Sequence, residues 1–103
     1  MIITGGENVS PAEIESILSL HPAIAEIAVA ALPDERLGQR VTAFVKRAGA
    51  VEAEALDAWC RNSPLADYKR PRAWNFVVEI PKSPVGKILR RKLVAGEYER
   101  DSR

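Results

Sequence analysis

The residues best suited to chemistry lie in one loop, Pro81-Lys82-Ser83-Pro84-Val85-Gly86-Lys87, in which a glycine directly precedes a lysine. Glycine lets the backbone approach a ligand closely, and the lysine ammonium presents a compact point charge to an oxyanion. A positive charge held in this way stabilises the negative charge that develops on a phosphoryl or carboxylate group during reaction. Lys87 is therefore the candidate catalytic residue.

A second glycine-rich loop lies at Gly5-Gly6-Glu7-Asn8-Val9. Paired glycines can bring the main chain against a slender ligand, or they can simply form a tight turn before a helix. The spacing matches neither a P-loop nor a dinucleotide-binding fingerprint. Taken alone, the loop leaves both interpretations open.

Positive charge is concentrated in the last third of the chain. Between Lys69 and Lys92 there are eight basic residues and one acid, Glu79, so that this segment carries +7 and the remainder −6. Such asymmetry indicates an anionic partner, of which phosphate is the commonest, or else a basic face that is merely solvated. The eight residues are Lys69, Arg70, Arg72, Lys82, Lys87, Arg90, Arg91 and Lys92.

Other catalytic arrangements have little support. One cysteine, Cys60, excludes an internal disulfide, and a single histidine, His21, leaves no cluster with metal-ligand spacing, so no metal site is expected. His21 precedes a proline, which favours a capping or surface role. Glu13 and Glu15 are two positions apart and point to different sides of a helix, so we expect them to serve capping and solvation.

The chemistry-bearing loops require elements that position them. Ser10 as N-cap, Pro11 at the first helical position and Glu13 closing a capping box predict a helix that runs to His21-Pro22. Apolar, β-branched runs at 24–32 and 40–47, joined by the turn 33–38, predict a hairpin. A second helix is expected over 52–61, with Cys60 in the core.

The remaining segments complete a small α+β domain. The aromatic and β-branched run 73–80 predicts a third strand, 81–86 a loop and 87–95 a third helix. Residues 97–103 form a charged tail that we expect to be frayed. The order of elements predicts a small sheet covered by helices.

Length and composition agree with this organisation. The chain has 103 residues, 47% hydrophobic and 28% charged, which suits one compact soluble domain. No apolar run approaches the roughly 20 residues that cross a bilayer, and the first residues lack the pattern of a signal peptide. We therefore expect a cytoplasmic protein.

Four segments together resemble a known family. They are the glycine loop leading into 9–15, the turn 32–39, Tyr68-Lys69-Arg70-Pro71 and the loop 81–87. In this order and spacing they resemble the small C-terminal lid domain of the acyl- and aryl-CoA synthetases, acid-adenylating enzymes related to luciferases and peptide-synthetase adenylation domains. Benzoate-type and 4-chlorobenzoate-type CoA ligases are the most similar. The resemblance covers 1–96 and implies a fold of about three strands, a short N-terminal strand and covering helices.

The resemblance implies a two-step ligase. A carboxylate attacks the α-phosphate of ATP and releases pyrophosphate, and the CoA thiol then captures the acyl-adenylate to give a thioester and AMP. Members swing this domain between the steps, and Lys87 matches the lysine that reaches the carboxylate and α-phosphate during adenylation. Bacterial lysines at this position are acetylation targets, which would remove the charge.

The resemblance also implies CoA-binding residues. Gly5 and Gly6 match the loop that lines the pantetheine tunnel, with Glu7 beside it, while Tyr68, Arg70 and Arg72 match positions that contact the CoA nucleotide. Leu37 stands where the family often has a tryptophan near the CoA adenine.

The partners implied are the large N-terminal domain, ATP with its Mg²⁺ and CoA. The large domain, which supplies the acid pocket and most ATP contacts, has no counterpart in this sequence, so the chain alone is expected not to turn over. Met1-Ile2-Ile3 matches an internal stretch of relatives, which suggests an excised domain.

The alternatives to a CoA ligase domain are a domain that loads a carrier protein instead of CoA, a separate subunit that docks onto a large-domain protein, and a nucleic-acid-binding domain using 69–92.

Overall fold

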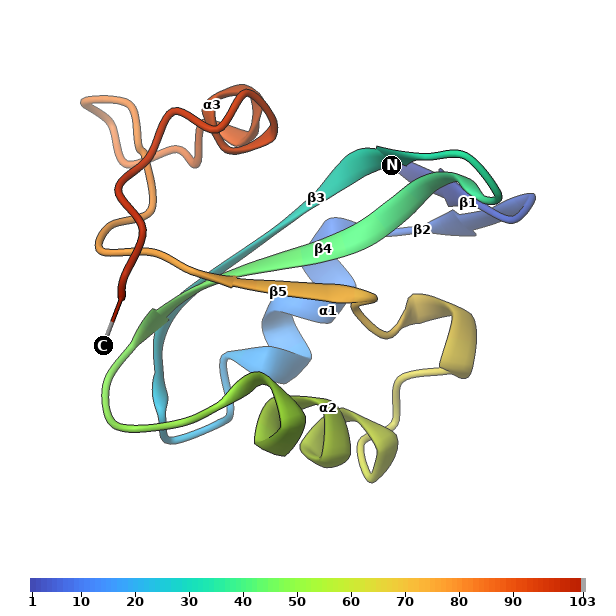
Figure 1. Cartoon of the computed structure of the whole chain (residues 1–103), viewed down its shortest axis with the longest axis horizontal. Helices are drawn as coiled ribbons and strands as arrows, with labels where there is room; N and C mark the ends of the chain where they lie inside the picture. Colours follow the sequence, from blue (N-terminus) through green and yellow to red (C-terminus); the bar gives the residue numbers. More distant parts are fainter. Residues whose placement is uncertain (103) are drawn as a thin grey trace.

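A three-stranded sheet forms the centre of the molecule, which we describe from a computed structural model covering residues 1–102. Strands β3 (Ile24–Asp34) and β4 (Gly38–Arg47) make a long antiparallel hairpin. Strand β5 (Ala73–Phe76) lies parallel to β4 on its other side (Figure 1). The order β3-β4-β5 makes β4 the central strand and leaves β3 and β5 as the edges.

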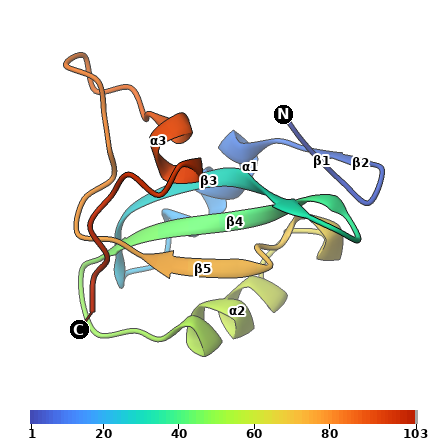
Figure 2. The same ribbon diagram turned by 45° about the horizontal axis from the view of Figure 1, so that its top comes forward.

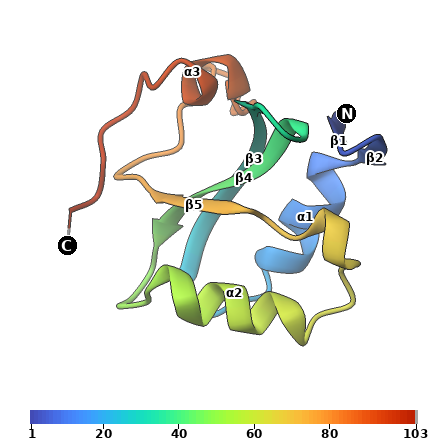
Figure 3. The same ribbon diagram turned by 45° about the vertical axis from the view of Figure 1, so that its right-hand side comes forward.

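Helices cover both faces of this sheet. Helices α1 (Pro11–Leu18) and α2 (Ala53–Arg61) lie on one face, and the short α3 (Arg90–Val94) lies on the other (Figures 2 and 3). Strands β1 (Ile2–Thr4) and β2 (Glu7–Val9) form a separate two-stranded sheet, and a 3₁₀ turn, η1, spans Asp67–Lys69. The α+β class is as predicted, although the N-terminal segment makes two short strands and not one.

Two apolar cores lie on the two faces of the sheet. Ile27 and Val29 of β3 belong to the core under α1 and α2, whereas Ala28 and Ala30 belong to the core under α3. Successive residues of a strand face opposite sides, so a strand covered on both faces must be apolar at every position. This requirement explains the continuous apolar run of β3. Cys60 is fully buried in the first core, as predicted.

The start of α1 confirms half of the predicted capping box. The Ser10 hydroxyl accepts a hydrogen bond from the Glu13 N–H at 3.4 Å, and Pro11 is the first helical residue. The Glu13 carboxylate does not complete the box but bonds the Lys69 ammonium at 2.9 and 3.1 Å. His21 caps the chain after the helix as expected, because its Nδ1 accepts from the Ala23 N–H at 3.0 Å.

The expectation of a frayed tail is wrong for residues 97–101. Val77 makes an antiparallel bridge with Arg100, and the Val78 N–H donates to the Glu99 carbonyl at 2.9 Å. The tail thus lies beside residues 76–78, where β5 ends at Phe76 and not at residue 80 as predicted. Asp101 fixes this contact with a buried ion pair to Arg47 at 3.2 Å.

The third helix also begins later than predicted. Residues 87–89 are not helical: Ile88 pairs with Lys82 in an antiparallel bridge, and the Leu89 N–H donates to the Pro81 carbonyl at 2.9 Å. The apolar spacing that predicted a helix from Lys87 has another cause, since Ile88 and Leu93 both pack against the second core. Lys87 therefore belongs to a hairpin-like loop that precedes α3.

Candidate functional site

The loop that carries Lys87 is braced by its own backbone. The Gly86 N–H donates to the Ser83 carbonyl and the Ser83 N–H donates to the Lys87 carbonyl, both at 2.8 Å. The Lys87 N–H donates to the Ser83 hydroxyl at 3.2 Å. Gly86 adopts φ 86°, a left-handed conformation that side-chain-bearing residues rarely adopt, so the turn requires glycine there. The loop presents Lys87 from a defined turn.

The Lys87 ammonium is exposed and has no ion pair or hydrogen bond within residues 1–102. Two basic residues of the same region are engaged: Lys82 pairs with Glu26 of β3, and Arg90 pairs with Glu15 of α1. Val85, two positions before Lys87, is 89% exposed, so the loop projects from the sheet. A free ammonium on a braced projecting loop can reach an anionic group supplied from outside this domain.

The glycine pair forms the tip of the β1–β2 hairpin. Thr4 pairs with Glu7 across the tip, and Gly5 and Gly6 both have positive φ, 56° and 84°. Two consecutive positive φ angles define the tight turn that suits a two-residue hairpin. The Gly5 N–H donates to the Leu37 carbonyl at 3.0 Å, which docks this tip on the β3–β4 turn. The Glu7 side chain is exposed.

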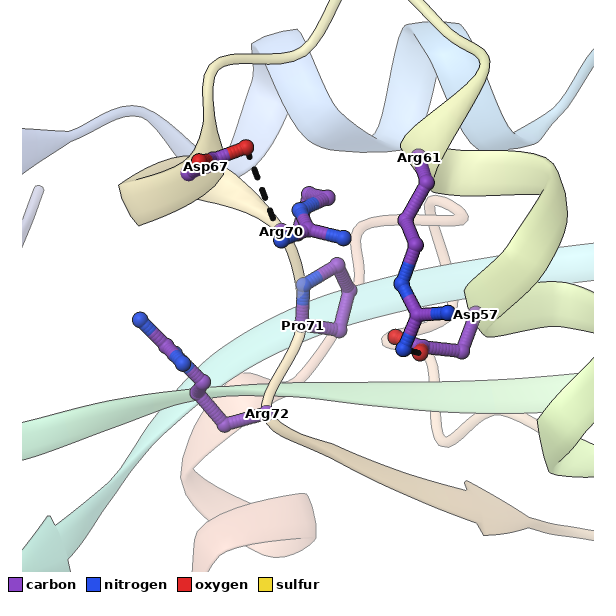
Figure 4. A pocket seen from close by; sticks show the side chains of 6 residues that line it. All are labelled: Asp57, Arg61, Asp67, Arg70, Pro71 and Arg72. Atoms are coloured by element: carbon purple, nitrogen blue, oxygen red, sulfur yellow. Dashed lines mark ion pairs between the residues drawn. The ribbon is translucent and has the colours of Figure 1, made fainter.

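Arg70 and Arg72 line a pocket of about 220 Å³ beside the end of α2 (Figure 4). Arg70 lies 3.5 Å from the Asp67 carboxylate, and Arg61 is paired with Asp57 at 2.7 Å. The Arg70 Nε is buried without a hydrogen-bond partner among the described residues. In this pocket the guanidiniums of Arg61 and Arg70 are therefore paired with carboxylates, whereas that of Arg72 is not.

Arg72 also lines a second pocket, of about 290 Å³, next to the glycine hairpin. In Figure 4 the Arg72 side chain points away from Arg61, so Arg72 lies between the two pockets. Leu37 lines this second pocket, and its carbonyl accepts the hydrogen bond from Gly5 at the tip of the β1–β2 hairpin. This pocket thus brings together Leu37 and Arg72, two predicted residues that are 35 positions apart in the sequence. Its lining residues are Asp34, Arg36, Leu37, Arg40 and Arg72.

Asp34 organises this second pocket. Its carboxylate accepts hydrogen bonds from the Leu37 N–H at 2.8 Å and the Arg36 N–H at 2.9 Å. The bond from Leu37, followed by the bond from Arg36, holds the pKa of Asp34 below its ordinary value against the opposing effect of burial. Arg40 lies 3.9 Å from the same carboxylate, whereas Arg36 has no ion pair within residues 1–102.

Tyr68 lies apart from both pockets. It sits on η1, is 37% exposed, and has the Lys69 ammonium 5.7 Å from its ring centroid. The hydrogen bond to Glu13 raises the pKa of Lys69 and ties η1 to α1. The structure therefore brings Arg70 and Arg72 together, connects Gly5 to Arg72 through Leu37, and leaves Tyr68 and Glu7 on neighbouring surface.

Three polar residues have contacts or positions that the sequence did not predict. Arg36 and Arg40 lie in the turn 32–39, where the functional signal was attributed to Leu37. Glu15 was expected to be solvated, but it accepts bonds from Val29 and Arg90 and is mostly buried. The excess of arginine around Asp34 is the signal that could have identified the first two.

Within residues 1–102, no three His, Cys, Asp or Glu side chains are grouped so as to hold a metal ion. None of the helices in this part of the chain is both long and apolar enough to cross a membrane.

Comparison with known proteins identifies the family to which this α+β domain belongs. AMP-binding enzyme C-terminal domains match residues 13–87. The chain is 51% identical over 96 residues to a 4-chlorobenzoate–CoA ligase of Pseudomonas sp. (strain CBS-3), covering 91% of this chain and 18% of that protein. It is 50% identical over 101 residues to a long-chain-fatty-acid–CoA ligase of Bacillus subtilis (strain 168), covering 96% and 18%.

The fold gives the same assignment. A Mycobacterium tuberculosis fatty acyl CoA synthetase superposes with a TM-score of 0.88 at 42% identity, over 93% of this chain and 19% of that one. The chain therefore belongs to the family of AMP-binding enzyme C-terminal domains. It spans less than a fifth of the length of these relatives.

Proposed function

We propose that this chain is the mobile C-terminal domain of an AMP-forming carboxylate–CoA ligase and that Lys87 supplies the positive charge for adenylation. Family membership supports the class of reaction. The observation that carries the role of Lys87 is its exposed ammonium, which has no partner within residues 1–102 although it sits on a hydrogen-bonded turn. A charge held in place before the reaction does not have to reorganise as charge develops.

The chemistry proposed for Lys87 is electrostatic. A substrate carboxylate oxygen attacks the α-phosphorus of ATP, the bond to the bridging oxygen breaks, and pyrophosphate leaves with that electron pair. Negative charge on the α-phosphate oxygens is greatest during this exchange, so an ammonium placed there lowers the barrier. The ammonium keeps its proton throughout, and the acyl-adenylate is the product.

The second proposed site is the CoA site at the glycine hairpin and the arginine pockets. The residues present suit phosphate groups, because Arg36 and Arg72 line one pocket and neither is paired with a carboxylate in the described chain. Gly5, Gly6 and Glu7 would border the pantetheine arm, and Arg70 and Tyr68 would lie toward the nucleotide. When bound there, CoA would supply the thiol that takes the acyl group from the adenylate, losing its proton as the acyl–oxygen bond to AMP breaks.

The remaining partners follow from this assignment. The large N-terminal domain would provide the acid pocket and most contacts to ATP and its Mg²⁺, and it would meet Lys87 in one half-reaction and the glycine hairpin in the other. A cytoplasmic location accompanies the proposal, since ATP and CoA are both available there.

The test uses a ligase that carries this chain as its C-terminal domain. Lys87→Ala is expected to lower ATP–pyrophosphate exchange by about 10²-fold or more, the usual cost of removing one preorganised charge-stabilising group. Thioester formation from supplied acyl-adenylate should remain near wild type. Lys87→Gln keeps most of the side-chain length but removes the charge, as acetylation would, and should behave like Lys87→Ala.

Lys92→Ala is the matched control, because Lys92 is another exposed lysine without a partner within residues 1–102. It should leave both half-reactions unchanged. Exchange that survives in Lys87→Ala would overturn the proposed role.

A further inference from the structure

The outer edge of β3 is closed at Val29 by two side chains. The Val29 N–H donates to Glu15 Oε2 at 2.8 Å, and the Val29 carbonyl accepts from Arg90 Nε at 3.0 Å. Since β3 is an edge strand, its outward N–H and carbonyl groups have no neighbouring strand. Glu15 and Arg90 thus take the place of a strand at this residue.

The two side chains also bind each other. Arg90 Nη2 lies 2.8 and 2.7 Å from the two Glu15 oxygens, and both side chains are partly buried. One guanidinium therefore engages three acceptors, one carbonyl and both carboxylate oxygens. A lysine ammonium is a single point charge and cannot reproduce this planar arrangement.

This cluster is the attachment point of the Lys87 loop. Arg90 is the first residue of α3 and lies three residues after Lys87, with Ile88 and Leu89 held by backbone bonds to the other arm of the loop. The other arm is attached to the same strand, because Lys82 pairs with Glu26. Both arms of the loop are therefore tied to β3, at Glu26 and at Val29.

We propose that Arg90, clamped by Glu15 and Val29, is a positioning residue that fixes where Lys87 stands relative to the sheet. The inference rests on the proposed function of Lys87. Arg90 would act only through the backbone that joins it to Lys87, without touching a reacting group. A displacement of about 1 Å in a catalytic group can cost on the order of 10²-fold in rate, so a looser attachment should be visible in the adenylation step.

The experiment compares Arg90→Lys, Arg90→Ala and Glu15→Gln in a ligase that carries this domain, with Arg91→Ala as the matched control. Arg91 is the next residue of α3, exposed and without a partner in residues 1–102. We expect kcat for adenylation to fall roughly 10-fold or more in Arg90→Lys, with KM for ATP and thioester formation from supplied acyl-adenylate near wild type. Thermal unfolding confirms that each variant is folded.

A double-mutant cycle separates positioning from a structural role. In a Lys87→Ala background, Arg90→Lys should cause no further loss of adenylation, because the group that Arg90 positions is absent. An equal loss of both half-reactions, a full additional loss in that background, or no loss at all would overturn the inference. Should Arg90→Ala fail to fold, Arg90→Lys and Glu15→Gln still show whether adenylation falls while thioester formation stays near wild type. Intact adenylation in Lys87→Ala alone would instead overturn the proposed function.

Discussion

Cys60 illustrates how burial fixes the chemistry of a single side chain. Its thiol is fully buried, and the loss of hydration, together with the nearby Asp57 charge, raises its pKa to about 11 against the opposing effect of Arg70. At pH 8 the reactive thiolate should be about 100-fold scarcer than for a thiol with the ordinary value. We predict slow alkylation of the folded chain by iodoacetamide and fast alkylation in urea. Equal rates in the two conditions would contradict the burial of this thiol.

Asp34 gives a prediction with a defined pH window. Because its pKa is lowered in the folded state, ionised Asp34 stabilises the fold above the unfolded value of 3.8, and this contribution is lost as pH falls through the folded pKa. The stability advantage of wild type over Asp34→Asn should therefore be constant above about pH 5 and shrink below pH 3.8. Urea unfolding between pH 2.5 and 6 measures this difference in the free energy of unfolding. A difference that grows in acid would contradict a lowered pKa of Asp34 in the folded state.

At the scale of elements, the docked tail contributes to stability. Arg47 and Asp101 are 4% and 8% exposed, and Arg47 also donates to the Val51 carbonyl at 2.9 Å and lies 4.0 Å from the Phe76 ring centroid. Removing one partner of a buried pair costs about 3–5 kcal/mol. Asp101→Ala should lower the free energy of unfolding by an amount of this order.

Glu99→Ala is the control for the tail. Glu99 contributes its backbone carbonyl to Val78, and its side chain is exposed, so its replacement should leave stability nearly unchanged. A similar loss in the two variants would mean that the acid at 101 has no special role.

The β1–β2 turn makes a conformational prediction. At Gly6 an added Cβ meets nothing within 4 Å, so the cost of a substitution there comes from φ 84° and not from a clash. Gly6→Ala should destabilise by about 1–2 kcal/mol, and Gly6→Asn by less, because asparagine tolerates the left-handed region. Denaturant unfolding of the two variants measures the difference, and equal losses would argue for a steric cause.

Local signals predicted the elements whose contacts are close in sequence. The Ser10 cap and Pro11 determine where α1 begins, and the β3–β4 hairpin follows from two apolar runs around a turn. Both depend on residues within about one element of each other, which periodicity and capping rules describe well.

Long-range pairings were not predictable in this way. Residues 99–101 pair with the chain at the end of β5, and the role of Glu15 depends on Arg90, 75 positions away. A charged tail has the composition of a frayed terminus, yet a buried ion pair at Asp101 holds it. In α3, the spacing of Ile88 and Leu93 reflected packing on a shared core and not a continuous helix.

At the scale of the whole molecule, the candidate groups lie at two separated ends. The loop 81–87 projects beside α3, whereas the glycine hairpin and the β3–β4 turn lie at the other end of the sheet (Figures 1 and 2). The sequence motifs pointed to candidate residues at both ends, Lys87 at one and Gly5 and Gly6 at the other. The sharing of Arg72 between two pockets, and the contribution of Arg36 and Arg40, required the fold that brings the turn beside residue 72.

This separation predicts opposite effects for two variants. In a ligase carrying the domain, Arg72→Ala should raise KM for CoA by roughly 10-fold, since it removes the charge-assisted contact that we propose between Arg72 and a CoA phosphate, and should leave ATP–pyrophosphate exchange unchanged. Lys87→Ala should lower ATP–pyrophosphate exchange and leave KM for CoA unchanged. Arg100→Ala removes an exposed arginine outside both pockets and serves as the control. A loss of exchange in Arg72→Ala would contradict the separation of the two ends.

The ion pair at Val29 has a further consequence for how the molecule meets other chains. An edge strand of 11 residues offers a row of backbone groups that could recruit a strand from a second copy and begin aggregation. Glu15 and Arg90 occupy that edge at Val29, near its middle, and place charged groups where an incoming strand would have to lie. The same two side chains that anchor the lysine loop thereby protect the sheet against edge-to-edge association.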